Sequence, residues 1–223
     1  MLLAMARLIV FGAGDQARLA HFYFSTDSPH EVVAFVVDAA FKTAETFDGL
    51  PLVPFEEIAQ RYPPSEFDAF VALGYSQMNR LRAAKYDAMK AAGYRCVSYV
   101  SSRCTYLATS PPGDNCLILE DNTVQPFVTI GNDVTLWSGN HIGHDSVIED
   151  HCFITSHVVV SGHVRIGERS FLGVNATLRN AITLAPGTLI AGGAVVMKST
   201  RPGDVYYGER AKKAPQSSDE IKL

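Results

Sequence analysis

The sequence of 223 residues predicts two domains of different fold class, an α/β domain followed by a parallel β-helix. Two observations carry this prediction. Short apolar strands alternate with helical segments in the N-terminal half, and an aliphatic residue recurs at every sixth position from Ile118 to Val196. We expect the α/β domain over 1–108, the β-helix over 109–200 and a C-terminal tail over 201–223. Each of the first two is long enough to bury its own core.

The N-terminal half has the alternation typical of a parallel sheet covered by helices. Strands are expected at 7–11, 31–37, 68–73 and 95–100, and helices at 15–26, 55–61 and 77–92. The first turn has the form GxGxxA, with Gly12, Gly14 and Ala17, and Asp38 ends the next strand. This is a Rossmann-like fingerprint. Either a phosphate or nucleotide binds the amides of this turn, or the turn is a tight connection that binds nothing.

The second half contains an uninterrupted repeat. Steps of six residues land on Ile118, Val124, Ile130, Leu136, Ile142, Ile148, Ile154, Val160, Ile166, Leu172, Leu178, Leu184, Ile190 and Val196. Aliphatic residues occur at roughly one position in four in average usage, so this run is not chance. A period of six indicates a hexapeptide β-helix, with the aliphatic side chains pointing inward and the coils stacked at about 4.8 Å. An α-helix is excluded because the apolar residues do not recur at i+3 and i+4.

Composition excludes several classes of partner. The formal net charge is −4 and no basic block is present, so neither nucleic acid nor an anionic membrane is favoured. No segment has the roughly 18 to 20 apolar residues that span a membrane. The cysteines show neither a CxxC pair nor a disulfide spacing, which favours a reduced, cytoplasmic setting.

Histidines are concentrated in the repeat. His151, His157 and His163 are spaced by six, so they should occupy equivalent corners of successive faces and point away from one another. Zinc needs several ligands at about 2 Å from one centre. We therefore expect no metal within one chain, although a trimer would bring other histidines together.

His144 has a different relationship with its surroundings. It precedes Gly162 by one full coil, so its imidazole should lie beside a backbone N–H that no large side chain covers. Direct acyl transfer from a thioester needs a base for the attacking group and an amide donor for the oxyanion. Asp145 can orient the imidazole. The alternative is that His144 is a turn residue without a catalytic role.

The order and spacing of several motifs resemble one family. These are the GxG turn, Asp38, the Gly74…Asn79-x-x-Arg82 stretch, the His144-Asp145 pair, Gly162 and the C-terminal Gly208…Ala211-Lys212. They are similar to the PglD-like nucleotide-sugar N-acetyltransferases and the NeuD-type sialic-acid O-acetyltransferases of bacteria. The resemblance implies a left-handed β-helix, a homotrimer with acetyl-CoA between subunits, a nucleotide-linked sugar on the N-terminal domain, and a place in polysaccharide biosynthesis.

The resemblance also assigns residues. It makes His144 the base, Asp145 its partner and Gly162 the acetyl-contacting amide. The nucleotide-sugar contacts implied are Gly12, Gly14, Asp15, Gln16, Asp38, Gly74, Asn79 and Arg82. The coenzyme-A contacts implied are Phe153, which stands where some members have a second histidine, with Gly162, Gly192 and the tail residues Arg210, Lys212 and Lys213.

Trp137, Asn140 and His141 immediately precede the His144 turn, so we expect them to line the sugar pocket. Packing at a trimer contact is the alternative for Trp137.

The sequence therefore predicts an acyltransferase that moves an acetyl or similar group from acetyl-CoA to the amine of a nucleotide-linked aminosugar. The same residues would serve transfer to a sugar hydroxyl. A non-catalytic β-helix that binds nucleotides or supports assembly, and a zinc β-helix of the carbonic-anhydrase kind, are further alternatives. The sequence names neither the nucleotide, the sugar nor the acyl chain.

Overall fold

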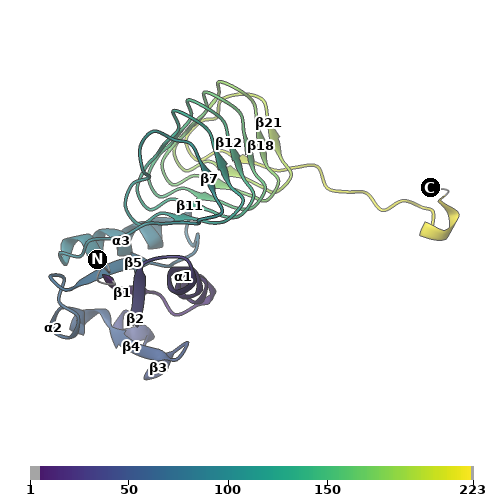
Figure 1. Cartoon of the computed structure of the whole chain (residues 1–223). Coiled ribbons are helices and arrows are strands. Elements are labelled where there is room, and N and C mark those ends of the chain that lie inside the picture. The colour runs from purple at the N-terminus through teal and green to yellow at the C-terminus, as the bar shows by residue number, and fades with distance from the viewer. Residues whose placement is uncertain (1–5, 222–223) are drawn as a thin grey trace.

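The computed structural model describes residues 6–221. The predicted bounds of the first domain and of the tail also include residues 1–5 and 222–223, which lie outside the described residues. An α/β domain sits against one side of a β-helix, and the tail leaves the last coil and extends away from both (Figure 1). The predicted combination of fold classes is confirmed. Among the described residues, no helix is long and apolar enough to cross a membrane.

The α/β domain is built on a five-stranded sheet in the order β3-β4-β2-β1-β5. The central strand β1 (Ala6–Phe11) pairs in parallel with β2 (His30–Val37) and β5 (Phe67–Val71). Strand β4 (Leu50–Pro54) is parallel to β2, and β3 (Thr46–Phe47) is antiparallel to β4 at the edge. The second half of β1 is fully buried, as expected of a parallel strand covered on both faces.

Each face of this sheet has its own core. On one face, α1 (Asp15–Thr26) packs with the sheet and with the first strands of the β-helix. On the other face, α2 (Ile58–Arg61) and α3 (Arg80–Ala91) cover the sheet. Short 3₁₀ helices lie at η1 (Ala39–Phe41), η2 (Phe55–Glu57) and, in the tail, η3 (Ser218–Glu220). The β-helix is therefore part of the cover of the α/β sheet.

Three parallel sheets form the β-helix. Sheet I contains β6 (Tyr99–Val100), β8 (Leu117–Ile118), β11 (Thr135–Leu136), β14 (Phe153–Ile154), β17 (Phe171–Leu172), β20 (Leu189–Ile190) and β22 (Val205–Tyr206). Sheet II contains β7 (Thr105–Tyr106), β9 (Thr123–Val124), β12 (His141–Ile142), β15 (Val159–Val160), β18 (Thr177–Leu178) and β21 (Val195–Val196). Sheet III contains β10 (Thr129–Ile130), β13 (Val147–Ile148), β16 (Arg165–Ile166) and β19 (Thr183–Leu184).

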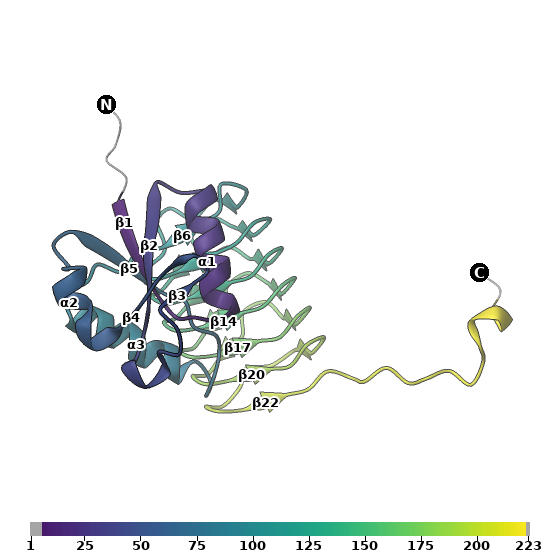
Figure 2. The same ribbon diagram turned by 90° about the horizontal axis from the view of Figure 1, so that it is seen from below.

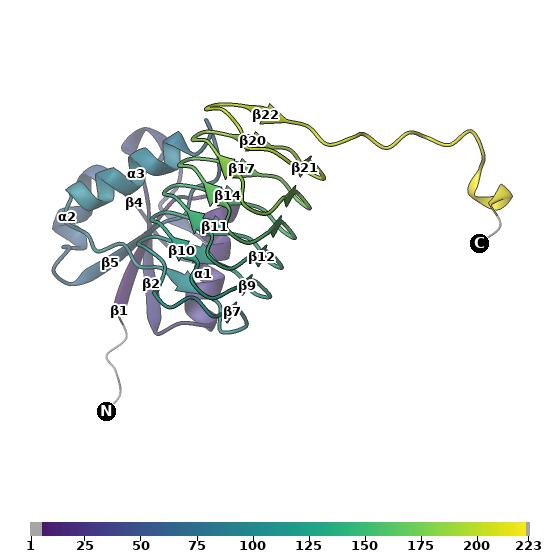
Figure 3. The same cartoon turned by 90° about the horizontal axis from the view of Figure 1, so that it is seen from above.

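The coils stack in register along one axis, with sheet I next to the α/β domain (Figures 2 and 3). For example, His141 pairs with Val159 and Ile142 with Val160 in the next coil. All the aliphatic residues of the predicted repeat lie in one buried core inside the coils. The interpretation of the six-residue period is confirmed.

Every turn between 115 and 193 contains one residue in the left-handed conformation, and from Asp121 onward it lies three places after the aliphatic residue. These residues are Asn115, Asp121, Phe127, Asp133, Gly139, Asp145, His151, His157, His163, Arg169, Asn175, Ala181, Gly187 and Gly193. Glycine, Asn, Asp and His tolerate this conformation best. The six-residue spacing of His151, His157 and His163 thus coincides with a backbone requirement of the fold.

Some predicted boundaries differ from the structure. The strand expected at 95–100 is divided, because Cys96 forms only a bridge with Ala69 and β6 belongs to sheet I. Strands β6, β7 and β22 carry the β-helical pairing beyond the expected 109–200 at both ends. The helix expected at 77–92 begins at Arg80 because Gln77, Met78 and Asn79 have positive φ.

Candidate active site

His144 lies in the turn that joins sheet II to sheet III, and its ring packs on the turn of the following coil. A Cβ atom built on Gly162 would lie 2.8 Å from His144 Nε2 and 2.9 Å from Cε1. The predicted stacking of His144 on Gly162 is therefore present. Only a glycine at 162 leaves room for the ring in this position.

Gly162 has little exposed surface, and its amide makes no hydrogen bond within the described residues. Among residues 6–221, its N–H donates to no acceptor, whereas the amide of His144, one coil earlier, donates to Gln125 Oε1 at 2.9 Å. A Cβ on Gly143 would lie 2.5 Å from Gly162 N, so the missing side chain keeps this amide uncovered. The Gly162 amide is thus available to an oxygen atom from outside.

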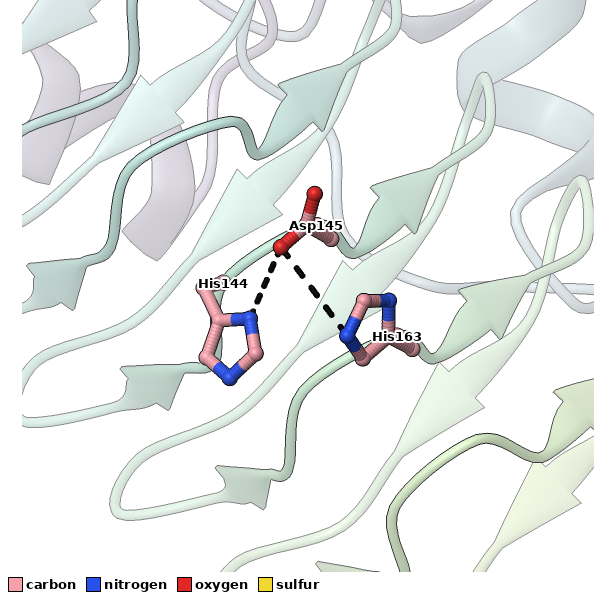
Figure 4. A group of neighbouring side chains, drawn as sticks. All are labelled: His144, Asp145 and His163. Carbon is pink, nitrogen blue, oxygen red and sulfur yellow. Dashed lines mark hydrogen bonds and ion pairs between the residues drawn. The ribbon is translucent and has the colours of Figure 1, made fainter.

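Asp145 holds the imidazole of His144 in one orientation. His144 Nδ1 lies 2.8 Å from Asp145 Oδ2 (Figure 4). Because the carboxylate accepts this hydrogen bond, the proton of the neutral ring stays on Nδ1 and the lone pair stays on Nε2. The nitrogen that can accept a proton is therefore the one beside Gly162. The His144 and Asp145 side chains are 50% and 42% exposed, so a ligand can reach them.

His163 joins this pair and was not among the predicted site residues. Its Nε2 lies 4.0 Å from Asp145 Oδ2, and its ring meets that of His144 edge-on, with centroids 5.0 Å apart. His151, His157 and His163 do lie at three different corners, as expected. The missed relationship is between His163 and Asp145, which occupy the same left-handed position in adjacent coils. Counting one coil forward from Asp145 would have found it.

A second candidate site is a cavity of about 470 Å³ in the α/β domain. Gly12, Asp38, Phe41 and Lys85 are among its lining residues, which come from the ends of β1 and β2 and from α3. Ligands of open α/β sheets bind at this edge, beyond the carboxyl ends of the strands. Gly12 has φ +131° and a Cβ there would lie 2.7 Å from Ala72 O, so the turn requires glycine.

Of the predicted nucleotide residues, Gly12 and Asp38 line this cavity. Asp38 Oδ1 contacts Lys85 Nζ at 2.6 Å, which places a charge pair in its wall. Gly14, Asp15 and Gln16 follow the lining residue Ala13 at the start of α1, and Gly74 follows the lining residue Leu73.

The predicted nucleotide contacts of Asn79 and Arg82 are corrected by the structure. Their exposed fractions are 0% and 1%, and both side chains bind residues of the β-helix at the contact between the two domains. Asn79 Nδ2 donates to the carbonyls of Arg169 and Ser170, each at 3.2 Å. Arg82 pairs with Asp133. Neither side chain faces the cavity.

The structure places Trp137, Asn140 and His141, the predicted sugar-pocket residues, in three different environments. Trp137 packs against the core between α1 and sheet I, facing its own α/β domain. Asn140 is 1% exposed and its Oδ1 accepts from Val158 N at 2.7 Å, so it supports the coil. His141, on sheet II, and Trp137 both stay partly exposed.

The predicted coenzyme-A contacts fall at separate places. Phe153 is 1% exposed and lies in sheet I under Tyr75, with ring centroids 5.1 Å apart, so its prediction is wrong. Gly192 is in an exposed turn between sheets I and II, a different corner from that of His144. Arg210, Lys212 and Lys213 are exposed in the tail. Gly162 alone of this set contacts His144.

Sequence comparisons match the repeat region. The model of the bacterial transferase hexapeptide family (six repeats) matches residues 127–162. An acyl-[acyl-carrier-protein]–UDP-N-acetylglucosamine O-acyltransferase of Helicobacter pylori is 29% identical over 108 residues, covering 43% of this chain and 40% of that protein. The Burkholderia lata enzyme of the same name is 24% identical over 96 residues, covering 42% and 37%. The chain thus spans less than half the length of these relatives.

Comparison with solved structures covers both domains. The acetyltransferase domain of PglB from Neisseria gonorrhoeae superposes with a TM-score of 0.80 at 24% identity, covering 93% of this chain and 99% of that one. PerB from Caulobacter crescentus, in complex with CoA and GDP-perosamine, has a TM-score of 0.80 at 22% identity, covering 92% and 96%. The resemblance expected from the sequence is confirmed for the fold. The chain has the two-domain architecture of these acetyltransferase structures, an α/β domain joined to a hexapeptide β-helix.

Proposed function

We propose that this protein transfers an acetyl group from acetyl-CoA to the amine of a nucleotide-linked sugar, with His144 as general base. The observation that carries the proposal is the position of His144 Nε2 beside the Gly162 amide, which has no acceptor among the described residues. Support for the substrates comes from structures of the same fold: the PglB domain binds acetyl coenzyme A, and PerB binds CoA with GDP-perosamine.

In this mechanism, the amine nitrogen attacks the thioester carbon and His144 Nε2 takes the amine proton. General-base catalysis of this kind contributes about 10²- to 10⁴-fold. The oxyanion accepts the Gly162 N–H, and removing one such donor costs about 10²- to 10³-fold. The C–N bond forms, the C–S bond breaks, and the imidazolium returns the proton to the departing thiolate. Asp145 stabilises the imidazolium while it exists.

The positions of the two sites in one chain favour an oligomer. Sheet I contacts the α/β domain, whereas His144 lies at the corner between sheets II and III, which is opposite sheet I. A sugar bound in the cavity at Asp38 therefore faces away from the His144 of its own chain. We propose that a neighbouring subunit supplies the base, as in the trimer that the sequence resemblance implies. Light scattering of the purified protein measures the number of subunits.

A thiol-release assay tests the activity. Acetyl-CoA is combined with a panel of UDP-, dTDP- and GDP-linked amino- and hydroxysugars, and each product is identified by mass spectrometry. We expect release with one aminosugar and formation of an amide. Release only with a hydroxysugar would replace this proposal with acetyl transfer to oxygen; the two sequence relatives are named as O-acyltransferases. If no sugar gives thiol release and the protein also does not bind acetyl-CoA, acyl transfer from this donor is rejected.

A further inference from the structure

His144, Asp145 and His163 converge at one corner of the β-helix, on two adjacent coils (Figure 4). We propose that these three side chains bind a divalent transition-metal ion, with Zn²⁺ preferred, and that the bound ion blocks the base. The blocking effect rests on the proposed function, whereas metal binding does not.

The distances suit a small ion. One ligand atom from each residue lies within 4.8 Å of the other two, and Asp145 Oδ2 is 2.8 Å from His144 Nδ1 and 4.0 Å from His163 Nε2. Zinc bonds of about 2.0 to 2.2 Å place tetrahedral ligand atoms roughly 3.3 Å apart, between these two separations. The backbone bond from His163 N to His144 O, at 2.9 Å, fixes the two coils against each other. Rotation of the half-exposed side chains then completes the site.

A second Asp–His pair in the β-helix has a positively charged partner that the corner at Asp145 lacks. Asp133 and His151 also occupy left-handed positions one coil apart, and His151 Nδ1 lies 2.9 Å from Asp133 Oδ2. There the guanidinium of Arg82 supplies the positive charge at 3.0 Å. Asp145 has no Lys or Arg partner within the part of the chain that the structure describes. An added cation would take the place that Arg82 fills at the other corner.

The donor set selects the kind of ion. Two imidazoles and one carboxylate resemble the ligands of zinc sites that keep an open fourth position. Imidazole favours Zn²⁺, Co²⁺, Ni²⁺ and Cu²⁺, whereas Mg²⁺ and Ca²⁺ prefer oxygen ligands alone. We therefore expect binding of Zn²⁺ and Co²⁺ but not of Mg²⁺.

Metal binding has a direct consequence for His144. An ion on Nδ1 replaces the proton that Asp145 otherwise accepts, and the neutral ring then holds its one proton on Nε2. Nε2 is the nitrogen beside Gly162. It can no longer accept a proton from the substrate amine, so the metal-bound form is inactive.

Direct metal binding tests the site without reference to activity. Chelator-treated protein is titrated with Co²⁺, followed by its visible d–d absorption, and with Zn²⁺ in competition with a coloured chelator. We expect one ion per chain. His163→Asn keeps a residue suited to the left-handed turn, and it should weaken binding at least about tenfold. His157→Asn changes an exposed histidine at the equivalent place of another corner and should bind like the unaltered protein.

Activity then tests the inhibition. Zn²⁺ should suppress thiol release, EDTA should restore it, and His163→Asn should need at least about tenfold more Zn²⁺, relative to its own metal-free rate. Absence of a stoichiometric ion, or equal affinity in the His163→Asn variant, would overturn the site. Stoichiometric binding without inhibition would overturn the block, and both results stand apart from failure of the acetyl transfer itself.

Discussion

Arg82 joins the two domains through Asp133. Its Nε lies 3.1 and 3.0 Å from the two carboxylate oxygens of Asp133, and each side chain is 1% exposed. The same guanidinium donates to the carbonyls of Asp133 and His151 at 2.9 Å. The contact between α3 and the β-helix is therefore a buried, fully paired polar cluster.

Removal of this arginine should weaken the whole protein. In Arg82→Ala, the buried Asp133 carboxylate would lose its guanidinium partner and keep only the contact with His151, and breaking a buried ion pair costs about 3 to 5 kcal/mol. Urea unfolding measures this loss. Arg80→Ala, in the exposed first turn of the same helix, should change the free energy of unfolding by no more than about 0.5 kcal/mol. Equal stability of the two variants would contradict the role of the cluster.

Gly143 should be intolerant of any side chain. A Cβ there would lie 2.5 Å from both Gly162 N and Ser161 C, and these backbone atoms cannot move without separating the coils. We expect Gly143→Ala to lower the free energy of unfolding by about 1 to 3 kcal/mol. Gly74→Ala is the matched control, because its Cβ would meet no atom within 4 Å. A stable Gly143→Ala protein would show that the coils are looser than described.

Gly162→Ala should lower turnover without lowering the stability of the fold. The added methyl would lie 2.8 Å from His144 Nε2, and the half-exposed ring can swing outward to avoid it. Displacement of a catalytic group by about 1 Å costs up to roughly 10²-fold in rate. We therefore expect kcat to fall by about that factor while urea unfolding stays nearly unchanged. Unaltered kcat would contradict the alignment of His144 over this glycine.

Asp38 should affect substrate binding more than chemistry. It lines the α/β cavity and pairs with Lys85, so Asp38→Asn should raise KM for the nucleotide-linked sugar about tenfold with little change in kcat. Glu45→Gln removes a carboxylate that pairs with Lys42 outside the cavity lining, and it should leave KM unchanged. Equal changes of KM in the two variants would contradict binding of the nucleotide in the cavity at Asp38.

The cysteine thiols should be unreactive in the folded protein. Burial raises the pKa of Cys96, Cys116 and Cys152 to about 12 and that of Cys104 to about 11. Because the thiolate is the reactive form, its fraction at pH 8 is roughly 10⁻³ or less. An aromatic disulfide reagent should detect all the cysteines in urea and almost none in the native state. Fast native reaction would show that a thiol is accessible.

The six-residue period predicted the features that depend only on the geometry of the β-helical coil. The inward position of Ile142 and its equivalents, and the stacking of His144 on Gly162, follow from counting residues along one chain. The roles of Arg82, Phe153 and Trp137 depend on which outward face meets the α/β domain. The repeat contains no such information, since the inward pattern is the same on all three sheets.

The left-handed turns were a signal that the sequence did contain. Asn, Asp, His and Gly recur at the third place after many of the aliphatic residues, and these residue types tolerate positive φ. That pattern stacks Asp145 on His163 and Asp133 on His151. The spacing of the histidines alone, without the backbone conformation at these positions, indicates neither pair.

The most direct measurement of the central claim is the turnover of His144→Ala with acetyl-CoA and the aminosugar that the panel identifies. Loss of the base should lower kcat by about 10²- to 10⁴-fold, with acetyl-CoA binding and the subunit number unchanged because His144 is half exposed. His157→Ala, an exposed histidine at another corner, should keep full turnover. Turnover of His144→Ala close to that of the unaltered protein would contradict the assignment of His144 as the base.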